Sequence, residues 1–288
     1  MTFLPLSPCC LQGGKLIGEP RGKFVPANPA NDNGHKVSRY HTIPSYGKVI
    51  NDKVALVLFT DAFGLTSSNP KIIADEFANQ LKINVFVPEY IVDPPPIDVY
   101  DPVAPLYPDQ YNNRSWSTSI YMIGEVLWKT WRWLPMLFFP KKQVPLAQAA
   151  IDDLTEEGYE KLIGIGYCRG GAVLQYLLAD ESKNVNLIGG IINHPSTEKE
   201  TWSKINQPTL WNLADHDQMF SLKDIDHLKD VFGKRQINGN KKLDFQCNVY
   251  ENTVHGFACR PTLDHEPTKK AFDQANSSAV EFCRKYLF

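Results

Sequence analysis

A cysteine flanked by glycines marks the segment of this chain that is best suited to covalent chemistry. The segment reads Gly166-Tyr-Cys168-Arg-Gly170 and joins two apolar runs. This spacing predicts a strained turn from a strand into a helix, with the cysteine presented as a nucleophile. Glycine is expected at both flanking positions because a Cβ atom there would collide with the turn. Backbone N–H groups at the start of the helix would stabilise negative charge near the thiol. The alternative is a structural cysteine buried in a tight turn.

A cysteine nucleophile needs a base, and the base needs an acid that orients it. His255 follows a strand-like run and suits the base. The acid is Asp215 or Asp217, which both follow the run 209–213, and their spacing from that run favours Asp217. The order nucleophile, acid, histidine is one of the chain orders known for such triads. We therefore predict a triad of Cys168, His255 and Asp217.

The elements that must position these residues alternate along the chain. Predicted strands are short runs rich in β-branched and aromatic residues: 54–59, 83–88, 162–167, 187–193, 209–213 and 245–250. Predicted helices lie between or after them: 70–81, 145–157, 170–179, 222–232 and 268–286. Nearly continuous apolar runs indicate strands buried on both faces, whereas the last run is more polar and suits an edge. This alternation predicts an α/β fold, with a mostly parallel central sheet and helices on both faces. Ligands then bind at the carboxyl ends of the strands.

The segment 94–142 interrupts this alternation. It opens with three prolines and carries an aromatic amphipathic stretch that includes Trp128, Trp131 and Trp133. We expect an aromatic-rich cap at the ligand end of the sheet, and the alternative is ordinary packing on the flank of the domain. Charged residues and a proline within this stretch argue against a membrane-spanning helix. Apart from this insertion, residues 1–288 are interpreted as a single domain, with an irregular hairpin near the N-terminus.

The overall composition narrows the class of protein. With 30 basic and 32 acidic side chains, the chain lacks the basic surface that nucleic-acid binding requires. Apolar residues at 43% and charged residues at 22% indicate a folded chain rather than a disordered one. The six cysteines form no CxxC pair and no zinc-ligand spacing, and the N-terminus lacks the pattern of a signal peptide. We therefore expect no metal, reduced thiols and a cytoplasmic protein.

Six pieces of the sequence together match the motifs of one known family and keep its order. They are Cys9-Cys10, Asp61-Ala62-Phe63-Gly64, Gly166-Tyr-Cys168-Arg-Gly-Gly, His194-Pro195-Ser196, Ala214-x-x-Asp217 and His255-Gly-Phe-Ala-Cys-Arg260. With these pieces the chain resembles the dienelactone hydrolase family, in particular its fungal-type members. The resemblance spans almost the whole chain. It implies an α/β-hydrolase fold, cleavage of esters or lactones by the predicted triad, and no metal or organic cofactor.

The resemblance also implies roles for residues close to the nucleophile. The backbone N–H groups of Ala62 and Arg169 would form the oxyanion hole. The family has an acidic residue at the place of Asp61, which in bacterial members is usually glutamate. A negative charge near a thiol opposes its ionisation. We predict that Asp61 restrains thiolate formation at Cys168 in the empty site and so protects the thiol from oxidation.

Substrate recognition is less well defined by the resemblance. In dienelactone hydrolases an arginine just after the catalytic-histidine motif helps to bind the substrate carboxylate. Arg260 is the nearest match, but Cys259 intervenes and shifts its register by one residue. Arg114, in the divergent insertion, is a stand-in for the second substrate arginine of bacterial members. Tyr90 is a further candidate for contact with the substrate or the thiol.

The predicted reaction is hydrolysis of a lactone or activated carboxylic ester through an acyl-thioester on Cys168. A thiol nucleophile favours good leaving groups, such as those of enol lactones, aryl esters or thioesters. The alternatives are an esterase or thioesterase of the same fold with a more apolar substrate, a non-catalytic homologue that binds small molecules, and a redox-sensing thiol protein. The expected partner is a small-molecule ester or lactone, with no nucleic acid and no membrane. The sequence leaves the choice between monomer and homodimer open.

Overall fold

The computed structural model describes residues 14–28, 36–97, 139–237 and 241–288, together with positions 108, 117, 120, 121, 124, 128 and 131–133. Cys9, Cys10 and Arg114 lie outside the described residues. Most of the insertion 94–142 lies outside them as well, so the expected cap stays a prediction.

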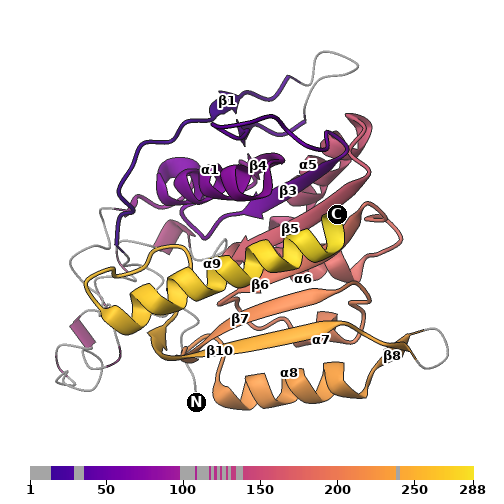
Figure 1. The fold of residues 1–288 in the computed structure, drawn as a ribbon. Helices are drawn as coiled ribbons and strands as arrows, with labels where there is room; N and C mark the ends of the chain where they lie inside the picture. The colour runs from indigo at the N-terminus through magenta and orange to yellow at the C-terminus, as the bar shows by residue number, and fades with distance from the viewer. Residues whose placement is uncertain are drawn as a thin grey trace.

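An eight-stranded sheet forms the centre of the described structure (Figure 1). In spatial order its strands are β1 (Lys23–Val25), β2 (Arg39–Thr42), β4 (Asn84–Pro88), β3 (Val54–Phe59), β5 (Lys161–Tyr167), β6 (Leu187–Asn193), β7 (Thr209–His216) and β10 (Phe245–Val254). The strands from β4 to β10 pair in parallel, whereas β2 and β1 pair antiparallel at one edge. A separate antiparallel ribbon consists of β8 (Gln236–Ile237) and β9 (Lys241–Lys242). The carboxyl ends of the parallel strands therefore all lie at the same end of the sheet.

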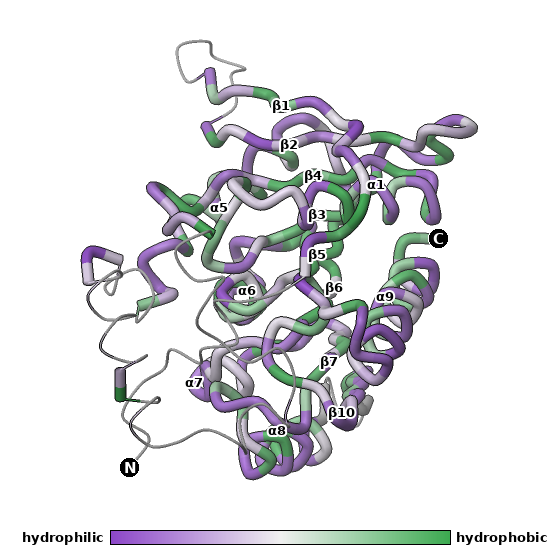
Figure 2. Tube along the Cα trace, turned by 90° about the vertical axis from the view of Figure 1, so that its left-hand side faces the viewer, coloured by the Kyte–Doolittle hydropathy of each residue, from purple (hydrophilic) through white to green (hydrophobic). Residues whose placement is uncertain are grey.

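Helices cover both faces of this sheet (Figures 1 and 2). One face packs against α1 (Asn69–Leu81) and α9 (Glu266–Leu287). The other packs against α5 (Val144–Glu156), α6 (Arg169–Ala179), α7 (Lys199–Trp202) and α8 (Leu222–Lys234). Short 3-10 segments occur at η2 (Gly64–Thr66), η4 (Trp131–Trp133) and η5 (Pro140–Lys142). Within the described residues, no helix combines the length and the apolarity needed to cross a membrane.

The central strand β3 shows why the apolar runs became buried strands. Leu56 and Leu58 pack in the core beneath α1 and α9, and Val57 and Phe59 pack in the core on the opposite face. Every residue of β3 is buried, because successive side chains of a strand point to opposite faces and both faces carry helices. The predicted α/β fold with a mostly parallel sheet is confirmed.

The predicted elements differ from the observed ones mainly at their ends. The runs 209–213 and 245–250 extend as β7 to His216 and as β10 to Val254. As expected, β10 lies at an edge of the sheet. No range was predicted for β2, whose four residues are polar or aromatic; it pairs antiparallel with β1, in the N-terminal region where the sequence predicts an irregular hairpin. Tertiary contacts hold it in place: Arg39 pairs with Glu157 at 2.8 Å, and the rings of His41 and Phe86 stack at 4.4 Å.

Candidate active site

Cys168 lies on a strained turn between β5 and α6. Its φ of 51° and ψ of −110° place a residue with a side chain in a region that favours glycine. A Cβ atom on Gly166 would lie 2.5 Å from the carbonyl oxygen of Gly170, and one on Gly170 would lie 2.1 Å from that of Phe59. These contacts involve backbone atoms, which cannot move aside as a flexible side chain could. The two glycines therefore let the start of α6 approach the end of β3 and fix the turn that carries Cys168.

His255 and Asp217 meet at the end of the sheet where the carboxyl ends of the strands lie. His255 directly follows β10, and Asp217 directly follows β7. His255 Nδ1 donates to Asp217 Oδ2 at 2.8 Å, and the other carboxylate oxygen accepts the backbone N–H of Met219 at 2.8 Å. Asp217 is 7% exposed and His255 is 2% exposed. The pair is thus shielded from water, and Asp217 fixes the orientation of the ring.

Asp215 has different contacts. Its carboxylate accepts the backbone N–H groups of Asn252 and Thr253 at 2.9 and 3.1 Å, and it lies 2.8 Å from His216 Nδ1. It therefore ties the irregular end of β10, just before His255, to the end of β7. Of the two aspartates weighed from the sequence, the structure brings Asp217 to the histidine.

The electrostatic environment of His255 favours its protonated form. Burial by itself lowers the pKa of this imidazole. The charges of Asp217 and Cys168, and the hydrogen bonds to both, raise it by more, so the pKa lies well above its usual value. Both the charge of Cys168 and a hydrogen bond to it raise this pKa, so Cys168 and His255 lie within reach of each other. This arrangement suits a thiolate–imidazolium pair.

The loop after β3 brings Ala62 to the other side of the turn. Asp61 Oδ1 accepts the N–H of Phe63 at 3.0 Å, and Tyr90 Oη donates to the carbonyl of Thr60 at 2.6 Å. Arg169 is the first residue of α6, where N–H groups lack carbonyl partners within the helix. The close contact of Gly170 with Phe59 joins this loop to the start of α6. The two segments expected to supply oxyanion donors are therefore adjacent.

Asp61 forms an internal ion pair with Arg260. Arg260 Nε lies 3.1 Å from Asp61 Oδ2, and its guanidinium carbon lies 4.3 Å from the centre of the Phe63 ring. The Cys259 thiol donates to the same carboxylate at 3.7 Å. Burial raises the pKa of Asp61, Arg260 lowers it, and the charge of Cys168 raises it, with a net rise. The carboxylate and the thiol therefore oppose each other's ionisation.

Two of the remaining substrate-binding candidates, Tyr90 and Arg260, are buried. Tyr90 is fully buried, and its pKa is raised because burial disfavours the charged phenolate. The hydroxyl of Tyr90 supports the Thr60 loop from the inside. Arg260 is only 5% exposed, and its charge is directed to Asp61. Arg114 lies outside the described residues.

His194 is a further residue at this site to which no role was given from the sequence. It directly follows β6 and is fully buried, and its ring centre lies 4.9 Å from that of His255. Its position directly after a predicted parallel strand could have identified it as a candidate. Asp217 and His255 were chosen because they follow strands in the same way. A ring contact between residues 61 apart in the chain has no local signal in the sequence.

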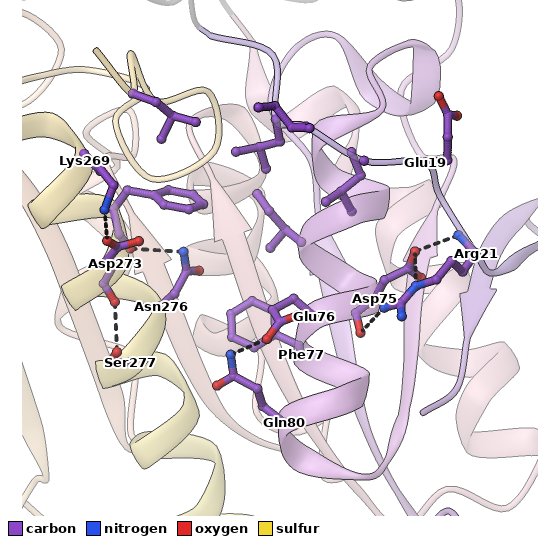
Figure 3. Close-up of a pocket in the computed structure, with 17 residues that line it drawn as sticks. Glu19, Arg21, Asp75, Glu76, Phe77, Gln80, Lys269, Asp273, Asn276 and Ser277 are labelled. Atoms are coloured by element: carbon purple, nitrogen blue, oxygen red, sulfur yellow. Dashed lines mark hydrogen bonds and ion pairs between the residues drawn. The ribbon is translucent and has the colours of Figure 1, made fainter. Parts of the chain in front are cut away.

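A hollow of about 810 Å³ lies between α1, α9 and the segment around Ile17 (Figure 3). Its apolar floor includes Phe77 and Ile73. Two ion pairs lie around it: Arg21 with Asp75 at 3.6 Å, and Lys269 with Asp273 at 3.0 Å. None of the three predicted triad residues lines this hollow.

The described residues offer no evident metal centre. Among them, no group of three or more His, Cys, Asp and Glu side chains is arranged to hold a metal ion. The four described cysteines, Cys168, Cys247, Cys259 and Cys283, form no disulfide with one another. Burial raises the pKa of Cys247 to about 11, which makes that thiol unreactive at neutral pH.

Comparison with known sequences identifies a single family. The sequence model of the dienelactone hydrolase family matches residues 106–287. The chain is 25% identical to hydrolase pyvD of Aspergillus violaceofuscus, over 100% of this chain and 99% of that protein. It is also 25% identical to hydrolase tropI of Talaromyces stipitatus, with the same coverage, and 24% identical to the human carboxymethylenebutenolidase homolog, over 81% and 82% of the two chains.

Solved structures share the fold at lower sequence identity. A dienelactone hydrolase-like promiscuous phosphotriesterase from metagenomic libraries aligns with a TM-score of 0.59 and 16% identity, over 93% of this chain and 99% of that one. Apo esterase 2 of Thermogutta terrifontis aligns with a TM-score of 0.55 and 13% identity, over 93% and 96%. These structures support the α/β-hydrolase fold.

Proposed function

Because the chain belongs to the dienelactone hydrolase family, we propose that it hydrolyses lactones or activated carboxylic esters through Cys168, His255 and Asp217. The observation that carries this proposal is the meeting of His255 with Asp217 at 2.8 Å, beside a cysteine on a strained strand-to-helix turn. Three chain segments far apart in sequence supply these groups. Each segment follows a strand of the parallel sheet, where α/β enzymes bind their ligands.

In the first step the Cys168 thiolate attacks the substrate carbonyl carbon, and a carbon–sulfur bond forms. The negative charge that develops on the carbonyl oxygen is stabilised by the backbone N–H groups of Ala62 and Arg169. When the carbon–oxygen bond to the leaving group breaks, the His255 imidazolium donates its proton to the departing oxygen. For a lactone, the leaving group stays attached to the acyl chain.

In the second step water hydrolyses the acyl-thioester. Neutral His255 removes a proton from water, and the resulting hydroxide attacks the thioester carbon. The carbon–sulfur bond breaks, which yields the carboxylic acid and returns the thiolate–imidazolium pair. Asp217 stabilises the imidazolium in both steps and keeps its Nδ1 occupied.

Asp61 adjusts this nucleophile before substrate arrives. The charges of Asp61 and Cys168 raise the cost of ionising each other, and Arg260 offsets part of the charge on Asp61. The empty enzyme then holds less thiolate than Cys168 and His255 alone would give. This restraint limits oxidation of the thiol, and the need for reduced thiols suits a cytoplasmic location.

The test compares wild type with Cys168→Ala on p-nitrophenyl acetate, an enol lactone and a thioester. We expect kcat/KM to fall by at least about a thousandfold for the ester, since the nucleophile is removed. Acid quenching during turnover should yield a covalent acyl adduct on the Cys168 peptide in wild type. Undiminished turnover by the variant contradicts the triad. Binding of these compounds without turnover by wild type would instead support a non-catalytic homologue, and the relative rates decide between a lactonase and an esterase or thioesterase.

A further inference from the structure

His194 occupies an unusual position beside His255. It is the first residue after β6, its φ is 33°, and its backbone N–H donates to the carbonyl of Asn212 at 2.8 Å. A positive φ in a residue other than glycine carries a conformational cost, and such costs concentrate at functional sites. The backbone conformation thus places the side chain in the interior, next to the proposed triad.

The ring of His194 packs mainly against other rings. Its centre lies 4.9 Å from that of His255, with 67° between the ring planes. The Phe257 ring lies 5.6 Å away on one side, and the Tyr167 ring lies 6.1 Å away. Neither ring nitrogen of His194 makes a hydrogen bond within the described part of the chain. The contacts that the structure gives this side chain are thus contacts between rings.

The charges around the two imidazoles differ. Asp217 and Cys168 face His255 and favour its protonated form. Burial and the positive charges of His255 and Arg260 lower the pKa of His194 well below its usual value. His194 therefore stays neutral when His255 is protonated, so it adds no positive charge beside the imidazolium. A neutral ring in edge-to-face contact is a favourable neighbour for a cationic ring.

We propose that His194 is a positioning residue, whose ring fills the space beside His255 and holds that imidazole in the orientation that bonds Asp217. The inference rests on the proposed function of the triad. The 2.8 Å bond to Asp217 fixes one edge of the His255 ring, and the contact with His194 limits rotation about that bond. Without a ring at position 194, His255 can turn away from Asp217, and the thiolate–imidazolium pair is populated less.

The experiment measures alkylation of Cys168 by iodoacetamide between pH 5 and pH 9.5, followed on the Cys168 peptide by mass spectrometry. It uses the full chain as wild type, His194→Phe and His194→Leu. Phenylalanine keeps a ring without nitrogen atoms, and leucine is apolar without a ring. At pH 6 we expect His194→Leu to be labelled about three- to tenfold more slowly than wild type. This factor corresponds to losing the interaction free energy of one aromatic pair. His194→Phe should follow the wild-type profile. At pH 9.5 the three rates should differ less than at pH 6, because high pH favours the thiolate without help from His255.

Several results would overturn the proposal. A wild-type profile for His194→Leu would show that the ring is not needed. An equal loss in both variants would assign the effect to the ring nitrogens. If His194→Leu does not fold, as judged by circular dichroism, His194→Phe decides: a wild-type profile supports the ring and a deficit overturns it. Failure of the triad itself is recognised separately, by full esterase activity in Cys168→Ala, and it would remove the basis of this inference as well.

Discussion

Replacing Asp217 with asparagine tests the central contact of the proposed site. The substitution keeps the shape of the side chain but removes the charge that lies 2.8 Å from His255 Nδ1. Two unit charges at this distance attract by about 6 kcal/mol at an effective dielectric constant of 20, before the cost of burying them is subtracted. An asparagine amide can also donate to Nδ1 and so select the wrong tautomer of the ring. Since that tautomer cannot accept a proton at the correct nitrogen, we expect kcat to fall by about ten thousandfold.

The assay measures kcat and kcat/KM for p-nitrophenyl acetate in Asp217→Asn and in Asp215→Asn. Asp215 is a matched control, because it is two residues away and binds the backbone N–H groups of Asn252 and Thr253 instead. We expect Asp215→Asn to retain activity within about threefold, since its amide oxygen can still accept one of the two hydrogen bonds and neither bond involves His255. Circular dichroism and thermal melting confirm that both variants fold.

Two results would refute this reasoning. Near-normal kcat in Asp217→Asn would mean that the carboxylate does not orient His255 during the reaction. An equal loss in Asp215→Asn would mean that the whole loop matters rather than one charge. Iodoacetamide labelling of Cys168 adds a second measure, because loss of the imidazolium should slow the reaction at pH 6 in Asp217→Asn alone.

Three further predictions follow from contacts around the turn. Asp61→Asn should speed iodoacetamide labelling of Cys168 near pH 6.5 by about three- to tenfold, because a like charge is removed; an unchanged rate contradicts the restraint assigned to Asp61. Gly170→Ala should destabilise the fold by about 1–3 kcal/mol or more in urea unfolding, since its Cβ would lie 2.1 Å from the Phe59 carbonyl oxygen. Gly233→Ala, whose Cβ meets nothing within 4 Å, should not destabilise it, and equal losses in the two variants would argue against a packing cause. The raised pKa of His255 contributes stability that is full below about pH 6.5 and is lost as pH rises through the folded-state pKa. The difference in Tm between wild type and Asp217→Asn should therefore shrink from pH 6 to pH 9, and a difference that grows would contradict the ion pair.

The sequence by itself determined the class of fold and the local shape of the turn. Apolar runs of strand length between amphipathic helices leave few arrangements other than a parallel sheet covered on both faces, because every such strand must bury both sides. Gly166 has a local reason, since a Cβ atom there would lie 2.5 Å from the carbonyl oxygen of Gly170 in the same turn. These features depend on residues a few positions apart, and periodicity and spacing record such relations directly.

Only the tertiary structure decided which groups meet. Asp215 and Asp217 are two residues apart, yet Asp215 accepts backbone N–H groups at the end of β10 whereas Asp217 contacts His255. The pairing of Arg260 with Asp61 joins positions 199 apart and gives the arginine an internal partner. The contact of His194 with His255 depends on how the ends of β6 and β10 lie in the sheet. Such contacts arise from strand order and register, which bring distant segments together and leave no mark in local sequence.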